Sequence, residues 1–242
     1  MKINVLYSPQ NADDLYFTEK TTVVIDVLRA SSTIIAAVEN GAKEVIPVST
    51  VEFAVKVSGG MFGGQTLLCG ERNTKKIEGF ALGNSPAEYT KKLIEGKSIV
   101  FYTTNGSKAI LKAKFSENLF ICTFNNLTAV AKHLIKLNKN VEILCAGNNN
   151  LFSLEDSVCA GRLIREIVFL NSETQLSDSA KGAWALEMEF GKNTLQMLKN
   201  SEHGEILIKN GFEEDLKYCG IHNSSSTIPV LKGNVLKAMT DN

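Results

Sequence analysis

VVIDVLRASST, residues 23–33, is the stretch that predicts the fold of this 242-residue chain. An apolar, β-branched run typical of a buried strand ends at Asp26, and Arg29 follows three residues later. Three hydroxyl side chains then stand where the next helix is expected to begin. In an open α/β sheet, ligands bind beyond the carboxyl ends of the strands, and a helix start there offers N–H groups to an anion. The stretch therefore predicts a strand that ends in a ligand site.

The side chains of this stretch suit both a metal and an anion. Asp26 is a hard oxygen ligand of the kind that Mg²⁺ prefers, and Arg29 has a planar fork that fits phosphate or sulfonate. A carboxylate placed directly after an apolar strand should lie near the sheet and needs a partner there. Asp26 is therefore the first candidate for a functional residue.

Short apolar runs alternate with helical patterns from the N-terminus to about residue 170. The predicted strands are Ile3–Leu6, Thr22–Asp26, Glu44–Val48, Thr66–Cys69, Ser98–Tyr102, Leu119–Thr123 and Val141–Cys145. The predicted helices are Ser32–Asn40, Val51–Val57, Ser85–Ile94, Gly106–Ala113, Leu127–Leu137 and Ser153–Leu170. This alternation predicts an α/β fold with a mostly parallel sheet and helices on both faces.

The pattern changes after Leu170. Ser177 is the expected cap of a helix over Ala180–Gly191, and further helices are expected through about Asn210. Thr227–Leu231 is predicted to return as an edge strand, because an edge tolerates its proline. We expect one α/β domain over residues 1–242, in which the extra helices of the C-terminal third, about 177–242, are a candidate subdomain.

Composition excludes several classes of protein. Lys and Arg number 26, as do Asp and Glu, so no net charge favours nucleic acid or an anionic membrane. The apolar runs are too short to span a bilayer, and the N-terminus lacks a signal-peptide pattern. Five cysteines without CxxC spacing indicate reduced, buried thiols, and we expect a cytoplasmic protein. A homodimer is expected only because twofold assemblies are common.

Polar residues also follow three other predicted strands. Glu71-Arg72 is a second carboxylate–arginine pair, residues 103–106 (TTNG) form a hydroxyl-rich turn, and Gly147 precedes a helix whose first turn holds Glu155 and Asp156. Each feature alone has an ordinary structural explanation, such as a surface ion pair, a turn or a partner for the helix dipole. Four such strand ends at one edge of the sheet favour a functional site.

Familiar alternative motifs are absent or incomplete. The glycine-rich stretch 58–64 precedes its strand and lacks the Lys-Ser/Thr of a P-loop, so we predict a mobile loop. Leu28 stands where haloacid-dehalogenase phosphatases have a second aspartate. His133, His203 and His222 have no metal-ligand spacing and are expected to be solvated or structural.

Five motifs in order resemble the 2-phosphosulfolactate phosphatase family. They are DVLRASST (26–33), GER (70–72), GFALGNSPAEY (79–89), TTNG (103–106) and LEDSVCAG (154–161). The resemblance spans about Val23 to Leu163. It implies a Mg²⁺-dependent hydrolase that removes phosphate from (2R)-2-phospho-3-sulfolactate, a step toward coenzyme M in methanogens and toward sulfolactate in some bacteria.

This hypothesis assigns roles to the residues at the strand ends. The catalytic candidates are Asp26, Arg29, Glu71 and Arg72, and the candidate Mg²⁺ ligands are Asp26, Glu71, Glu155 and Asp156. The candidate groups for a small polyanionic substrate are Ser31, Ser32, Asn84, Ser85, Thr103, Thr104, Asn105, Gly106 and Gly147. Two other functions stay open: a phosphatase for other 2-hydroxycarboxylic acid phosphates, and a non-catalytic binder of small acidic metabolites. Either Asp26 or water can serve as the nucleophile.

Overall fold

The computed structural model describes residues 1–13, 15–60 and 65–240. Of the glycine-rich stretch for which we predicted a loop, residues 58–60 form the end of helix α2 (Val51–Gly60), and residues 61–64 lie outside the described residues.

Eleven strands of the described chain form one sheet, in the order β5-β4-β6-β3-β11-β10-β7-β2-β8-β1-β9. The strands are β1 (Lys2–Leu6), β2 (Thr21–Ile25), β3 (Glu44–Pro47), β4 (Thr66–Arg72), β5 (Lys75–Lys76), β6 (Ser98–Tyr102), β7 (Asn118–Cys122), β8 (Val141–Cys145), β9 (Gln175–Leu176), β10 (Pro229–Lys232) and β11 (Val235–Ala238). The central pairs β1–β8, β8–β2 and β2–β7 are parallel, as are β3–β6 and β6–β4. The predicted α/β class with a mostly parallel sheet is confirmed.

Strand β2 shows why both faces of the sheet are covered. Val23 and Ile25 pack into one apolar cluster with helices α5 (Leu127–Leu137) and α6 (Leu154–Leu170). Val24 points to the opposite face and joins the cluster of α1 (Ala30–Glu39) and α4 (Gly106–Lys112). Because strand side chains alternate between faces, a continuous apolar run is what a strand buried on both sides requires. This burial holds the end of β2, and hence Asp26, in a fixed place.

The loop prediction was wrong at residues 58–60, and two further sequence predictions about local structure were also wrong. β10 lies inside the sheet, antiparallel to β7 and β11, and not at an edge. The β10–β11 hairpin fills the space between β7 and β3, and Pro229 is the first residue of its strand, where a missing N–H is tolerated. The single helix predicted over Ser85–Ile94 is instead a 3₁₀ turn, η2 (Pro86–Glu88), followed by the short helix α3 (Lys91–Ile94).

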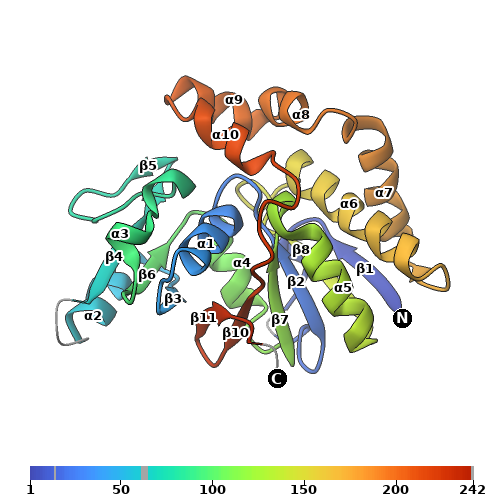
Figure 1. The fold of residues 1–242 in the computed structure, drawn as a ribbon, viewed down its shortest axis with the longest axis horizontal. Helices are drawn as coiled ribbons and strands as arrows, with labels where there is room; N and C mark the ends of the chain where they lie inside the picture. The colour runs from blue at the N-terminus through green and yellow to red at the C-terminus, as the bar shows by residue number, and fades with distance from the viewer. Residues whose placement is uncertain (14, 61–64, 241–242) are drawn as a thin grey trace.

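The C-terminal third adds helices, as predicted. They are α7 (Asp178–Phe190), α8 (Thr194–Asn200), α9 (Glu202–Lys209) and α10 (Glu213–Cys219). The Ser177 hydroxyl accepts a hydrogen bond from Ala180 N at 3.1 Å, so the predicted cap is confirmed. Helices α8–α10 lie together at one end of the sheet (Figure 1). Two further 3₁₀ turns are η1 (Pro9–Asn11) and η3 (Phe124–Asn126).

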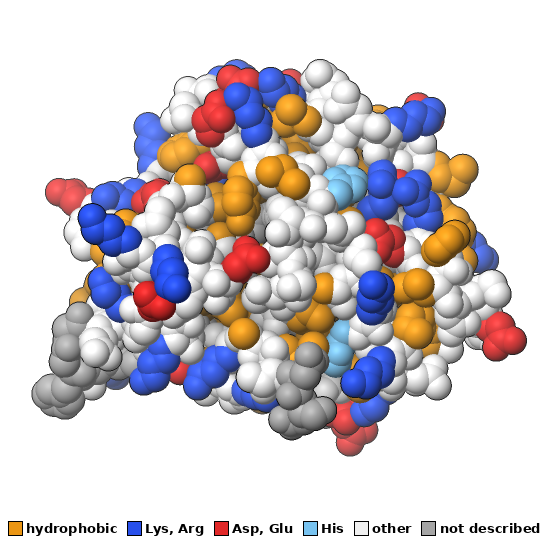
Figure 2. Space-filling model, in the orientation of Figure 1, with side chains coloured by type: hydrophobic (Ala, Val, Ile, Leu, Met, Phe, Trp, Pro, Cys, Tyr) orange, Lys and Arg blue, Asp and Glu red, His pale blue; other side chains and the backbone are white. Residues whose placement is uncertain are grey.

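The surface and the cysteines agree with the composition. Basic and acidic side chains are interspersed over the face drawn in Figure 2, without a large area of one sign. All five cysteines are buried and free. None of the described helices combines the length and apolar character needed to cross a bilayer.

Candidate active site

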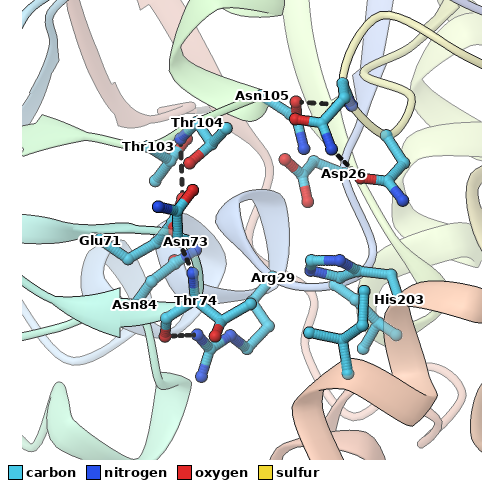
Figure 3. Close-up of a pocket in the computed structure, with 14 residues that line it drawn as sticks. Asp26, Arg29, Glu71, Asn73, Thr74, Asn84, Thr103, Thr104, Asn105 and His203 are labelled. Atoms are coloured by element: carbon cyan, nitrogen blue, oxygen red, sulfur yellow. Dashed lines mark hydrogen bonds between the residues drawn. The ribbon is translucent and has the colours of Figure 1, made fainter. Parts of the chain in front are cut away.

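A pocket of about 180 Å³ lies where β2, β4, β6 and β8 end and where α9 approaches them (Figure 3). Seven residues selected from the sequence line it: Asp26, Arg29, Glu71, Asn84, Thr103, Thr104 and Asn105. The structure thus brings the DVLR, GER, GNSP and TTNG motifs to one cavity. This convergence follows from the parallel sheet, which places the carboxyl ends of its strands along one edge.

Asp26 stands at the start of α1 with one carboxylate oxygen engaged. Its Oδ1 accepts a hydrogen bond from Ala30 N at 3.1 Å, and its own N–H donates to Ser31 Oγ at 3.0 Å. No other described residue donates a hydrogen bond to Oδ2. A Cβ atom at Gly106 would lie 2.4 Å from this Oδ2, so only glycine at this position lets α4 approach the carboxylate so closely. One oxygen of Asp26 is therefore held and the other is free to bind a ligand.

The surroundings of Asp26 oppose its ionisation. Burial, together with the nearby carboxylates of Glu71 and Glu155, raises the pKa of Asp26 to about 7, although the hydrogen bond from Ala30 N and the charge of Arg29 lower it. A buried acid with like charges around it favours the protonated form unless a cation compensates. The site thus has the electrostatic character of a place where a cation would bind.

Glu71 holds two threonines of the pocket lining, Thr74 and Thr104, in place. Its Oε2 accepts a hydrogen bond from Thr74 N and its Oε1 accepts one from Thr104 N, each at 2.7 Å. These two bonds join the end of β4 to the turn after β6. Carboxylate oxygens have further lone pairs, so both can still bind a ligand.

Three oxygens beside these carboxylates are buried without a hydrogen-bond partner: Thr74 Oγ1, Asn84 Oδ1 and Thr104 Oγ1. All three belong to residues that line the pocket. Leaving a buried polar group unpaired costs about 1–3 kcal/mol, so such groups in one cavity indicate that a polar ligand completes their bonding.

Arg29 lines the pocket, but much of its guanidinium is already engaged. Its Nη1 donates to Asp215 Oδ2 at 2.6 Å and its Nη2 donates to Thr74 O at 2.8 Å. Asp215 comes from α10, which no sequence motif marked. The positive charge of Arg29 is thus largely offset within the protein.

The other predicted site residues lie outside the lining of the pocket. Arg72 is exposed, whereas the hydroxyls of Ser31, Ser32 and Ser85 bond to protein groups.

Asp156 accepts hydrogen bonds from Val27 N and Gly147 N, and Glu155 is buried beside it. Burial, together with Asp26 and Glu155, raises the pKa of Asp156 well above that of an exposed aspartate. Through its two hydrogen bonds, Asp156 holds the segments that follow β2 and β8 in place without lining the pocket itself.

The family model described as 2-phosphosulpholactate phosphatase matches residues 7–234. The chain belongs to this family. A protein of Caldanaerobacter subterraneus, named probable 2-phosphosulfolactate phosphatase, is 39% identical over 235 residues, which cover 97% of this chain and 96% of the relative. Proteins of the same name from Thermotoga maritima and Clostridium perfringens are 43% and 38% identical, covering 89% and 99% of this chain and 91% and 97% of the relatives.

In this 2-phosphosulfolactate phosphatase family member, the pocket is also lined by residues that were not site candidates from the sequence: Leu28, Asn73, Thr74, Asn148, Asn149, His203 and Ile206. Asn73 and Thr74 directly follow GER, and Asn148 and Asn149 follow Gly147, so their position after a strand was a usable signal. His203 and Ile206 lie on α9, far along the chain. We had expected His203 to be solvated or structural, and no local pattern distinguished it.

The oxygen donors of the pocket fit Mg²⁺. Asp26 and Glu71 offer carboxylates, and Asn84 Oδ1 and Thr104 Oγ1 are unpaired hard donors. Among the described residues, no group of three or more His, Cys, Asp or Glu side chains is arranged to hold a metal. Mg²⁺ needs no such cage, because it is commonly bound by one or two carboxylates, waters and substrate phosphate. Asp26 and Glu71 are the carboxylates that line the pocket and could hold the ion there, whereas Glu155 and Asp156 do not line it.

Proposed function

We propose that this protein hydrolyses (2R)-2-phospho-3-sulfolactate to sulfolactate and phosphate, with Mg²⁺ as its cofactor. The observation that carries the proposal is the single pocket in which Asp26, Glu71 and three unpaired oxygens meet. Membership of the family and the names of the relatives support the substrate.

The charge balance of the pocket supports the need for a cation. The substrate carries a phosphate, a carboxylate and a sulfonate. Asp26 and Glu71 would repel it, and the charge of Arg29 is offset by Asp215 at 2.6 Å. A polyanion enters such a site favourably only if a bound cation reverses the local potential. A divalent cation would also favour the ionised form of Asp26.

In the proposed reaction, water adds to phosphorus, the ester P–O bond breaks, and the released oxygen takes a proton to become the 2-hydroxyl of sulfolactate. Bound Mg²⁺ would supply charge stabilisation to the phosphoryl oxygens. The hydroxyls of Thr74 and Thr104 would donate hydrogen bonds to the same oxygens, and Asn84 would help to orient the ester. Glu71 would keep both threonines in place through their backbone N–H groups. The groups are fixed before the substrate arrives, which is the condition for electrostatic catalysis.

The direct test is phosphate release from phosphosulfolactate by the purified protein, first treated with EDTA and then titrated with Mg²⁺. We expect no turnover in EDTA and recovery on adding Mg²⁺. Turnover that resists EDTA would reject the metal, whereas no release under any condition would reject the phosphatase activity.

We also propose a cytoplasmic location, since five free, buried thiols suit a reducing compartment. A part in coenzyme M biosynthesis and a homodimeric assembly stay predictions, and light scattering would test the second.

A further inference from the structure

A buried ion pair between Arg29 and Asp215 of α10 connects helices α8–α10 to the site. Arg29 Nη1 lies 2.6 Å from Asp215 Oδ2, and the two side chains are 1% and 5% exposed. Asp215 Oδ1 also accepts a hydrogen bond from Ser85 Oγ at 2.6 Å, and the ring of Phe212 lies 4.2 Å from the Arg29 guanidinium. These contacts fix the C-terminal helices relative to the strand ends.

With these contacts in place, one face of α9 lies over the pocket. His203 and Ile206, three residues apart and hence on one side of the helix, both line the cavity. Figure 3 shows the His203 ring extending from α9 toward the space that Asp26 and Arg29 border. Glu202 and Glu205 on the same helix are exposed. The pocket therefore has two sides of different chemistry: oxygen groups on the strand side, and an imidazole with an aliphatic chain on the helix side.

His203 differs from a histidine with a structural role. Its ring forms no hydrogen bond with any other described residue. In contrast, His222 Nε2 lies 2.8 Å from Thr194 Oγ1, and its ring stacks on Phe124 with centroids 5.1 Å apart. Burial, and next the charge of Arg29, lower the pKa of His203 below its ordinary value. At neutral pH the ring is thus mainly an uncharged N–H donor that still lacks an acceptor.

We propose that His203 and Ile206 determine substrate specificity by binding the part of the substrate that is not transferred. His203 donates a hydrogen bond to an acid group of the hydroxy acid, and Ile206 packs on its carbon skeleton. The inference rests on the proposed function, which assigns the phosphate to the strand side with Asp26, Glu71 and Thr104. The carboxylate and the sulfonate must then contact other parts of the pocket, and His203 is the unpaired donor on the helix side.

The test compares two phosphate esters in three variants. The esters are phosphosulfolactate and phenyl phosphate, which lacks an acid group besides phosphate. His203→Ala removes the donor, His203→Gln keeps an N–H donor, and Glu205→Ala is the matched control on the exposed side of α9.

For His203→Ala we expect kcat/KM on phosphosulfolactate to fall roughly tenfold or more, mainly through KM, because a hydrogen bond to a charged group is lost. On phenyl phosphate it should stay within about twofold, and His203→Gln should retain more activity on phosphosulfolactate than His203→Ala.

Equal losses on both esters would place His203 at the phosphoryl end and overturn the inference, as would no loss on either. 2-Phospholactate, which has the carboxylate but not the sulfonate, then identifies the acid group: a loss shared with phosphosulfolactate indicates the carboxylate, and a loss confined to phosphosulfolactate indicates the sulfonate.

Calorimetry with sulfolactate separates this inference from the proposed function. Weaker binding to His203→Ala than to the wild type supports the contact even if no ester is hydrolysed. Equal binding, or no binding by the wild type, contradicts it. Thermal unfolding of each variant shows whether the fold is intact.

Discussion

Nη1 of Arg29 and Oδ2 of Asp215 lie 2.6 Å apart although the residues are 186 positions apart in the chain. The pair joins the DVLR motif, which carries Asp26, to helix α10. Because Asp215 offsets the positive charge of Arg29, Arg29 adds little positive potential to the pocket. A bound cation is then needed to attract a polyanionic substrate.

Breaking this pair should destabilise the protein strongly. Asp215→Ala leaves the Arg29 guanidinium buried without a counter-charge, and loss of one partner of a buried pair costs about 3–5 kcal/mol. The double change Arg29→Met with Asp215→Leu should recover part of that loss, because neither charge is then buried alone. Urea unfolding of Arg29→Met, Asp215→Leu and the double variant measures the coupling, and simple additivity of the two single effects would show that the residues do not interact.

Gly106 should not tolerate a side chain. A Cβ atom there would lie 2.4 Å from both Asp26 Oδ2 and Ala30 Cβ, so Gly106→Ala must displace the carboxylate or the helix. We expect a loss of stability of about 1–3 kcal/mol and a fall in kcat of at least roughly tenfold. The matched control is Gly59→Ala, where nothing lies within 4 Å of the added atom. A Gly106→Ala protein with wild-type kcat would mean that the position of Asp26 is not critical.

Glu71→Gln should disturb the wall that holds Thr74 and Thr104. Both Glu71 oxygens accept backbone N–H bonds, and glutamine would present an NH₂ group to one of these donors. We expect kcat/KM to fall roughly a hundredfold and the midpoint of thermal unfolding to drop. Glu78→Gln, an exposed change in the turn that follows β5, is the control. If both variants behave alike, the two backbone bonds are not what Glu71 contributes.

The stability of the metal-free protein should depend on pH through Asp26. Burial raises the pKa of Asp26 from 3.8 to about 7, so between about pH 4 and pH 7 the folded protein binds a proton that the unfolded chain does not. Stability therefore falls as pH rises through this window. In EDTA, the wild type should gain more stability than Asp26→Asn when the pH is lowered from 8 to 5, and Mg²⁺ should reduce the difference. Parallel pH profiles of unfolding for the two proteins would contradict the raised pKa.

Local pattern predicted much of this fold. Three elements begin and end at the residues predicted from the sequence: Ser98–Tyr102, Val141–Cys145 and Leu127–Leu137. In each of them the apolar residues follow a single pattern, that of a strand or that of a helix, from the first residue to the last. Parallel strands then bring their ends together, so the meeting of Asp26 with Glu71 followed from topology.

Features that depend on distant pairing could not be predicted. β10 is interior only because β7 and β3 leave room for a hairpin, which no property of Thr227–Leu231 reveals. The approach of His203 likewise depends on the ion pair of Asp215 with Arg29, and neither α9 nor α10 carries a local signal for it.

The most direct test of the account is phosphate release from phosphosulfolactate with saturating Mg²⁺ by the wild type and by Asp26→Asn, which removes the free carboxylate oxygen without changing the shape of the side chain. We expect a loss in kcat of roughly a thousandfold, with thermal unfolding at least as high as that of the wild type, because a buried charge is removed. Activity of Asp26→Asn within about tenfold of the wild type would contradict the central role of Asp26.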